Sequence, residues 1–257
     1  MIKFFRHIRQ NLIMENKTSK YLKYAIGEIV LVVIGILIAL QINNWNEIRK
    51  QRLEEIETLK NIKSDFANAI LEFEENNAFK ERIISATALL YTIIGNEQSH
   101  YTKKKLDSLL AVLFINPTYN GQSETLNILF NSGKINIISN DAIKNALVLW
   151  PQQVVDMTED EVYSSNIVHN SLYPILKRYV SIFDINREIQ YKYKLFNYSE
   201  PSSFTSDYKG LFNDKEFEGT LASRELSLSV SLIQTRELIN TAKTIIDNID
   251  KDINNLK

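Results

Sequence analysis

Residues 25–42 form an almost entirely apolar segment. Glu28 and Gln41 are its only polar side chains, and the chain between them is an unbroken run of Val, Ile, Leu, Ala and Gly. An α-helix of this length extends about 27 Å, which is close to the thickness of the hydrocarbon core of a bilayer. Tyrosines precede the segment and Trp45 follows it, as expected at the two membrane interfaces. The sequence therefore predicts one transmembrane helix over residues 24–45.

Two other interpretations of this segment are a buried helix of a soluble protein and a cleaved signal peptide. A core helix rarely contains so long an unbroken apolar run. A signal peptide has a short basic region and paired small residues at its cleavage site. Here 24 residues precede the apolar segment, and Leu37, Ala39 and Gln41 lack that pairing. We therefore expect an uncleaved signal anchor.

Basic residues on either side of the segment predict its orientation. Those before it are Lys3, Arg6, Arg9, Lys17, Lys20 and Lys23, and those within twenty residues after it are Arg49, Lys50, Arg52 and Lys60. Six against four favours a cytoplasmic N-terminus by the positive-inside rule. The chain is then divided into a basic cytoplasmic tail (1–23), the transmembrane helix (24–45) and an extracytoplasmic domain (46–257). The tail suits an anionic inner leaflet, and no strongly basic domain remains for nucleic-acid binding.

Turn-forming residues are scarce throughout the chain. Seven Gly and four Pro in 257 residues favour long helices over strands joined by many turns. The chain has no Cys and three scattered His. This composition excludes disulfides, thiolate metal ligands and a Cys nucleophile, and it argues against a typical zinc site.

The residues that follow the predicted membrane helix show helical periodicity. Their apolar stripe consists of Ile48, Ile56, Leu59, Ile62, Phe66, Ile70 and Phe73. No Gly or Pro lies between Gly35 and Gly95, so the membrane helix is predicted to continue without a break as far as Asn76 and Asn77. These two weak helix formers are predicted to end it, and a second helix is predicted to run on to Gly95.

Further helices are predicted over residues 102–115, 123–130, 141–183 and 214–256. Ser123 is the predicted N-cap of the second of these helices, and Ser139 or Asn140 that of the third.

Breaks within this part of the chain are predicted at Pro151 and Pro174, which break or kink the third helix. Residues 134–138 are predicted to be extended. The predicted fold class is all-α, with one transmembrane helix that continues into an elongated extracytoplasmic helical bundle.

The usual catalytic motifs are missing. The chain contains no Gly-rich phosphate loop, HExxH, CxxC or GxSxG sequence. Ser206 and Lys209 have the S-x-x-K spacing without its companion elements, and Glu97 and His100 match one half of a di-iron motif without a second copy. The acidic residues 159–161 are interpreted as a solvated helix face. We therefore expect a protein that is not an enzyme and that binds no cofactor or metal.

Four residues in and beside the span are candidates for membrane or interaction roles. Glu28 is an ionisable group inside the apolar segment, where such groups are often functional, although at its shallow depth it can also snorkel to the interface. Gly35 and Ala39 form a small-xxx-small pair of the kind that lines helix dimers. Trp45 is the candidate interfacial anchor.

Aromatic residues are dense between residues 173 and 217. The tyrosines proposed as ligand-lining residues are Tyr173, Tyr179, Tyr191, Tyr193 and Tyr198. Rings with polar tips can line a small-molecule pocket. They can equally pack a long connector onto a bundle, and the sequence leaves both interpretations open.

Two segments resemble a known group of proteins. Residues 1–47, with YAIGEI followed by ALQINNWNE, and residues 131–147, NSGKINIISNDAIKNAL, resemble an uncharacterised Gram-negative bacterial family of proteins with a single N-terminal membrane anchor and a helical C-terminal domain. The resemblance implies a single-pass protein of the inner membrane with a periplasmic C-terminal domain. It implies no activity, catalytic residue or ligand.

These features predict a membrane-anchored, non-enzymatic interaction or scaffold protein. Its expected partners are the lipid bilayer and either a partner protein or a second copy of the chain, with no nucleic acid. The alternative is an extracytoplasmic ligand-sensing helical module that acts through a partner, because a tail of this length has no room for a signalling domain of its own.

Overall fold

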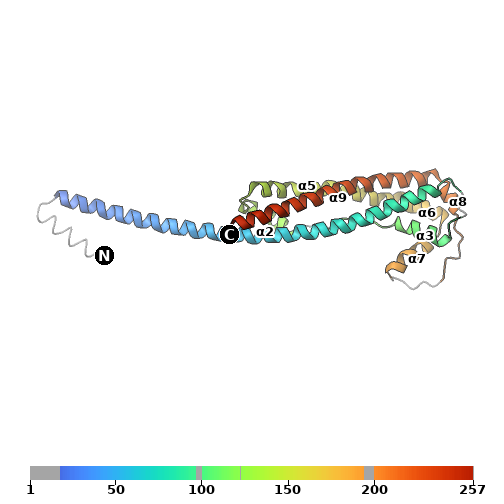
Figure 1. Ribbon diagram of the computed structural model, residues 1–257, viewed down its shortest axis with the longest axis horizontal. Helices are drawn as coiled ribbons and strands as arrows, with labels where there is room; N and C mark the ends of the chain where they lie inside the picture. The colour runs from blue at the N-terminus through green and yellow to red at the C-terminus, as the bar shows by residue number, and fades with distance from the viewer. Residues whose placement is uncertain (1–17, 97–99, 122, 194–199, 257) are drawn as a thin grey trace. The chain divides into compact units, whose positions relative to one another are not determined.

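The computed structural model describes residues 18–96, 100–121, 123–193 and 200–256, without the side chains of residues 18–21, 24, 190–193 and 256. Within these ranges every regular element is a helix and there is no strand (Figure 1). The all-α prediction is therefore confirmed. Most of the predicted basic tail, residues 1–17, lies outside the described residues.

Helix α2 (Thr18–Ile93) contains both the predicted span and the first part of the bundle. The predicted continuation of the membrane helix past Trp45 is confirmed, but the predicted break at Asn76 and Asn77 is wrong. Both asparagines are buried in the structure, at 9% and 8% exposure. Packing on this face of the helix therefore outweighs the weak helix propensity of Asn.

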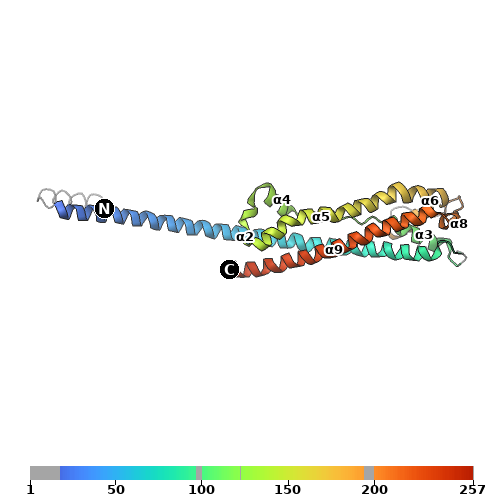
Figure 2. The same cartoon turned by 90° about the horizontal axis from the view of Figure 1, so that it is seen from above.

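The chain divides into two units, residues 1–57 and 58–257. The described part of the first unit is the N-terminal part of α2. In the second unit, the rest of α2 runs beside α5 (Asp141–Ile167) and α9 (Lys215–Leu256), as Figures 1 and 2 show.

Helix α9 is antiparallel to both α2 and α5. Along α2, Lys63 pairs with Asp250 at 2.6 Å and Glu81 pairs with Arg236 at 2.8 Å. Along α5, the amide of Asn140, the residue just before the helix, donates to Asp252 at 3.1 Å. The partner numbers on α9 fall as those on α2 rise, and they fall from Asp252 to Ser227 as those along α5 rise from Asn140 to Asp160. Helices α2 and α5 therefore run parallel to each other.

Short helices gather at the end of the bundle where α2 ends and α9 begins (Figure 1). They are α3 (Lys103–Val112), α6 (Tyr173–Tyr179), α7 (Ile182–Tyr193) and α8 (Tyr208–Phe212). Their shared core contains fully buried Leu90, Leu110, Leu176 and Phe212. Helix α4 (Glu124–Asn131) precedes α5 in the chain. The apolar side chains of these amphipathic segments are thus buried within the unit.

Polar residues cap the N-termini of α4 and α5, as the sequence predicts. The hydroxyl of Ser123 accepts a hydrogen bond from the backbone N–H of Leu126, and the side chain of Asn140 accepts from those of Ala142 and Ile143. The predicted cap at Ser123 is confirmed, and Asn140 is the cap of the two alternatives. Such caps satisfy backbone donors that have no partner within the helix.

The prediction for residues 134–138 is wrong, and of the two outcomes predicted at Pro151, a break or a kink, the break does not occur. Lys134–Ile137 are not extended but form a 3₁₀ helix. Ile138, which follows them with an extended backbone, is fully buried. Pro151 does not end α5, which continues to Ile167.

The second predicted proline break coincides with a change in helix type. Pro174 is the second residue after a π-helical turn, Val168–Leu172, and lies in the first turn of α6. A proline has no N–H to give to the carbonyl four residues earlier, and a locally widened turn accommodates it.

Candidate functional site

The four candidates of the predicted span all lie on α2. The 18-residue apolar window contains no buried residue, and the side chain of Trp45 is 64% exposed. A Cβ added at Gly35 would meet nothing within 4 Å. Glu28, Gly35 and Ala39 are spaced i, i+7 and i+11, so they share one helix face. This open face is compatible with helix association, and Ala39 lies one turn from Gly35 along it.

The five candidate tyrosines do not form a single described site. The ring of Tyr173 faces the ammonium of Lys177, 5.5 Å from its centroid, and the hydroxyl of Tyr179 donates to Asp214 at 2.9 Å. Both tyrosines therefore make packing and hydrogen-bonding contacts. The side chains of Tyr191 and Tyr193 and the whole of Tyr198 lie outside the described residues.

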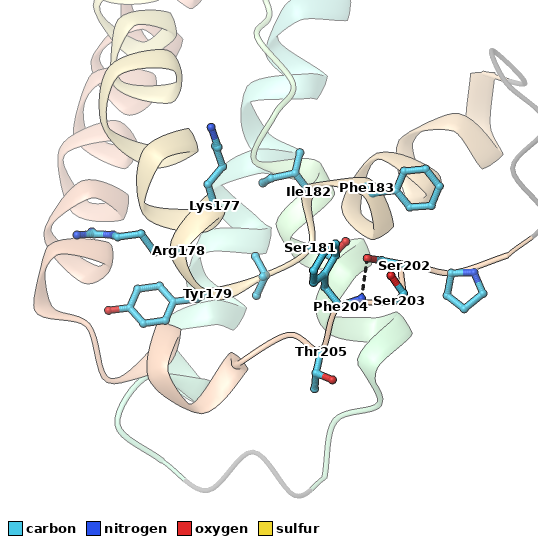
Figure 3. A pocket seen from close by; sticks show the side chains of 12 residues that line it. Lys177, Arg178, Tyr179, Ser181, Ile182, Phe183, Ser202, Ser203, Phe204 and Thr205 are labelled. Atoms are coloured by element: carbon cyan, nitrogen blue, oxygen red, sulfur yellow. Dashed lines mark hydrogen bonds between the residues drawn. The ribbon is translucent and has the colours of Figure 1, made fainter.

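A pocket of about 680 Å³ opens between the end of α6, the start of α7 and the loop of residues 201–205. Its lining includes Lys177, Tyr179, Phe183 and Phe204 (Figure 3). Of the two candidate tyrosines whose side chains the structure describes, Tyr179 contributes to it and Tyr173 does not. In Figure 3 the side chains of Arg178 and Tyr179 reach to one side, away from the ring of Phe204. The pocket combines apolar rings with two cationic residues, Lys177 and Arg178.

Asp184 links the loop of residues 201–205, which lines the pocket, to the rest of the unit. Its carboxylate is 3% exposed and accepts from the backbone N–H of Ser202 at 2.8 Å and from the ammonium of Lys103 at 2.5 Å. Burial by itself would raise the pKa of Asp184, but these hydrogen bonds and the nearby cations Lys103 and Arg187 outweigh it and lower the pKa below 3.8. The ionised form is therefore the one that holds the loop.

We expect acid to release this loop. Because the folded protein lowers the pKa of Asp184, its ionisation stabilises the fold above pH 3.8, and this stabilisation is lost as the pH falls through the lowered value. The Asp184→Asn variant should therefore be less stable than the wild type near neutral pH, with the difference shrinking in acid. Urea unfolding at several pH values measures this. A difference between the two proteins that does not depend on pH would contradict the assignment.

A buried ion pair with two further hydrogen bonds joins the three long helices of the second unit. The ammonium of Lys80 on α2 lies 2.7 Å from the carboxylate of Glu161 on α5, and their side chains are 0% and 2% exposed. The same ammonium donates to the hydroxyls of Ser231 and Thr235 on α9, at 2.8 and 3.0 Å. We call these four residues the Lys80 cluster. Burial lowers the pKa of Lys80, and the charge of Glu161 opposes this shift.

The Lys80 cluster corrects the interpretation of residues 159–161. Glu161 is not on a solvated face; its second oxygen accepts from the backbone N–H of Tyr119 at 2.7 Å. Tyr119 in turn stacks on Phe73 with ring centroids 4.2 Å apart. One signal in the sequence was available: Lys80 follows Phe66 and Phe73 at successive intervals of seven, so it occupies the buried stripe.

Arg224 is a second buried cation that sequence reasoning missed. It is 2% exposed, and its guanidinium donates to the carbonyls of Leu113 and Ile115 just beyond α3 and to the side chain of Asn116. Burial lowers the pKa of Arg224 to about 10. Because a cation is favourable near the C-terminus of a helix, Arg224 fastens the end of α3 to α9.

The fragments of catalytic motifs have structural partners or lie outside the description. The hydroxyl of Ser206 accepts from the backbone N–H of Ser181 at 3.1 Å, while Lys209 is exposed. Glu97 lies outside the described residues. The described contacts therefore give Ser206 a structural role in the loop.

Comparison with known proteins bears on a stretch that runs from within the predicted span to the first half of α5. No curated protein and no solved structure matches the chain. Residues 28–154 match the model of a family of unknown function (DUF6090), and this region contains the second of the two segments that resemble an uncharacterised family together with part of the first.

Proposed function

We propose that the protein is a single-pass inner-membrane protein that presents a non-enzymatic helical interaction module on the periplasmic side. The observation that carries this proposal is the exposure of the apolar window in α2. Leu31 and Leu37 are 67% and 59% exposed, and none of the window is buried. A helix of the core of a soluble protein would bury this surface, whereas a bilayer supplies its apolar surroundings.

The polar groups of the module support a structural rather than a catalytic use. Glu161 forms an ion pair with Lys80, and Arg224 donates hydrogen bonds to backbone carbonyls beyond α3. Both groups are inaccessible to a substrate, at 3% and 2% exposure. A bundle whose buried charged groups are engaged by its own helices leaves its outer surface for binding, as a scaffold requires.

Alkaline phosphatase fused after Lys257 is expected to be active, because the basic residues before the span favour a cytoplasmic N-terminus. A green fluorescent protein fused at the same position should remain dark if exported through the general secretory route, which makes it the reciprocal control. Membranes washed with carbonate should retain both fusions. A stable but inactive phosphatase fusion, or release by carbonate, would contradict the proposed anchoring and topology.

A second candidate function is ligand sensing through a partner protein, favoured by the pocket beside α7. Its volume of about 680 Å³ lies within the range of small-molecule sites, roughly 300–1,000 Å³. The exposed ring of Phe204 on one wall and Lys177 on another suit a ligand with an apolar body and an anionic group.

A binding test separates this candidate from the first. A metabolite at 100 times its dissociation constant should stabilise the full chain by about 2.7 kcal/mol, measured as a thermal shift in detergent. The Phe204→Ala variant should lose the shift, whereas Tyr101→Ala, which removes another exposed ring, should keep it. A shift that survives Phe204→Ala would exclude this pocket as the ligand site.

A further inference from the structure

The outer side of the α5–α9 pair contains a groove that the fold itself does not fill. The groove has a volume of about 200 Å³ and is lined by Gln153 and Asp156 of α5 and by Gln234, Glu237 and Thr241 of α9. The oxygen of the Gln234 side chain is buried and accepts no hydrogen bond from the described residues. Buried acceptors are normally paired with a protein donor or with water, so the Gln234 oxygen is free to accept from a group that enters the groove.

A row of exposed apolar side chains borders this groove. Leu226, Val230 and Ile233 on α9 are 67%, 36% and 57% exposed. Their spacing of i, i+4 and i+7 places them in one row, and Glu237 follows Ile233 by four residues on the same face. Contiguous exposed apolar side chains next to polar ones are typical of interaction sites.

An exposed tyrosine of α5 extends the apolar row across the helix pair. The hydroxyl of Ser227 donates to the carbonyl of Asp160 at 2.7 Å, so the two helices are in register at this point. Tyr163 of α5, which is 57% exposed, therefore comes level with the start of the row on α9. We call the groove with this row and Tyr163 the α5–α9 face.

The charge on the α5–α9 face is of one sign. Residues 145–176 contain no Lys or Arg, and neither do residues 225–235. The charged side chains that line the groove, Asp156 and Glu237, are both acidic. The nearest cation on α9, Arg236, pairs with Glu81 of α2 at 2.8 Å. The face is thus apolar and acidic, and the neighbouring cation Arg236 already forms an ion pair with Glu81.

We propose that the α5–α9 face binds an amphipathic helix of a partner protein, one that carries apolar side chains beside Lys or Arg. This inference rests on the proposed interaction function and names the chemistry of the partner. Apolar side chains of the bound helix cover Leu226, Val230 and Ile233, and its cations meet Asp156 and Glu237. Helix-in-groove recognition uses this combination, with charge complementarity selecting the partner.

The test uses the full chain in nanodiscs of zwitterionic phosphatidylcholine and two fluorescein-labelled peptides. One peptide has Leu and Lys in an amphipathic helical pattern, and the other replaces each Lys by Glu. Fluorescence anisotropy should show the Leu/Lys peptide binding at least about tenfold more tightly, because only its charges complement the face. Empty nanodiscs serve as the lipid control.

Matched variants locate the binding. Ile233→Lys should lower the affinity for the Leu/Lys peptide by about tenfold or more. Leu71→Lys, at an exposed leucine of α2, should leave this affinity within about twofold of that of the wild type. The double change Asp156→Lys with Glu237→Lys should transfer the preference to the Leu/Glu peptide. Circular dichroism checks that each variant remains helical.

Each contrary result has a distinct meaning. Equal binding of the two peptides, equal loss in Leu71→Lys, or an unchanged preference in the charge-reversed variant overturns the inference while leaving the proposed function intact. A dimer in sedimentation that Ile233→Lys converts to monomer assigns the face to a second copy and also overturns it. A chain that does not incorporate into nanodiscs refutes the proposed membrane anchoring before any peptide is added.

Discussion

Replacing Lys80 by Met is expected to lower the free energy of unfolding by about 3–5 kcal/mol, because removal of one partner leaves the other charge buried and uncompensated. Glu161 would then keep its carboxylate at 3% exposure with the backbone N–H of Tyr119 as its described partner. Urea unfolding of the full chain in detergent, followed by far-ultraviolet circular dichroism, measures the loss.

The exposed ion pair between Arg236 and Glu81 provides the matched control. It also joins α9 to α2, at 2.8 Å, but its side chains are 58% and 55% exposed. Arg236→Met should therefore lower the free energy of unfolding by at most about 1 kcal/mol. The double variant Lys80→Met with Glu161→Leu should recover most of the loss, since an apolar pair of similar volume is often as stable as a buried ion pair. A loss below about 1 kcal/mol for Lys80→Met would show that the ion pair is not buried as described.

Replacing Arg224 by Met is expected to destabilise the protein by about 3 kcal/mol, because each buried acceptor that loses its donor costs about 1–3 kcal/mol. The acceptors are the carbonyls of Leu113 and Ile115, the side chain of Asn116 and the hydroxyl of Ser164. Removal of a desolvated cation offsets part of this cost. Hydrogen exchange should accelerate most at the end of α3 and in the residues that follow it.

Arg178→Met is the corresponding control on an exposed arginine. Its guanidinium donates to Glu216 at 2.7 Å, with side chains 52% and 61% exposed, so the variant should lose at most about 1 kcal/mol. If Arg224→Met loses no more than this control, or if exchange accelerates uniformly along the chain, Arg224 does not fasten α3 to α9.

Local sequence signals account for most of the helices. Hydrophobic periodicity predicts α3, α5 and α9, and the caps at Ser123 and Asn140 are readable because they depend on backbone donors within three residues. The break at Asn76 and Asn77 was predicted wrongly because the outcome there depends on contacts with residues that are distant in the sequence. Helix propensities are small energies, of a few tenths of a kcal/mol, and contacts from distant helices outweigh them.

The candidate site was less predictable than the fold. Tyr179 does line a pocket, but its partners Phe183, Ser202 and Phe204 come together through contacts between distant residues, among them those of Asp184 with Lys103 and with Ser202. Aromatic density in the sequence indicates that rings will cluster. It does not tell which rings face a cavity and which face a neighbouring helix.

By itself the sequence determined the apolar window, the continuation of its helix past Trp45 and the all-α class, because each depends on residues within a few turns of one another. Only the tertiary structure decided that Glu161 is buried while its neighbour Glu159 is exposed, and that Lys80 lies 2.7 Å from a carboxylate 81 positions away. Burial of a charge depends on which helix covers it. That choice is made by the packing of three helices at once, and no local pattern in one of them specifies it.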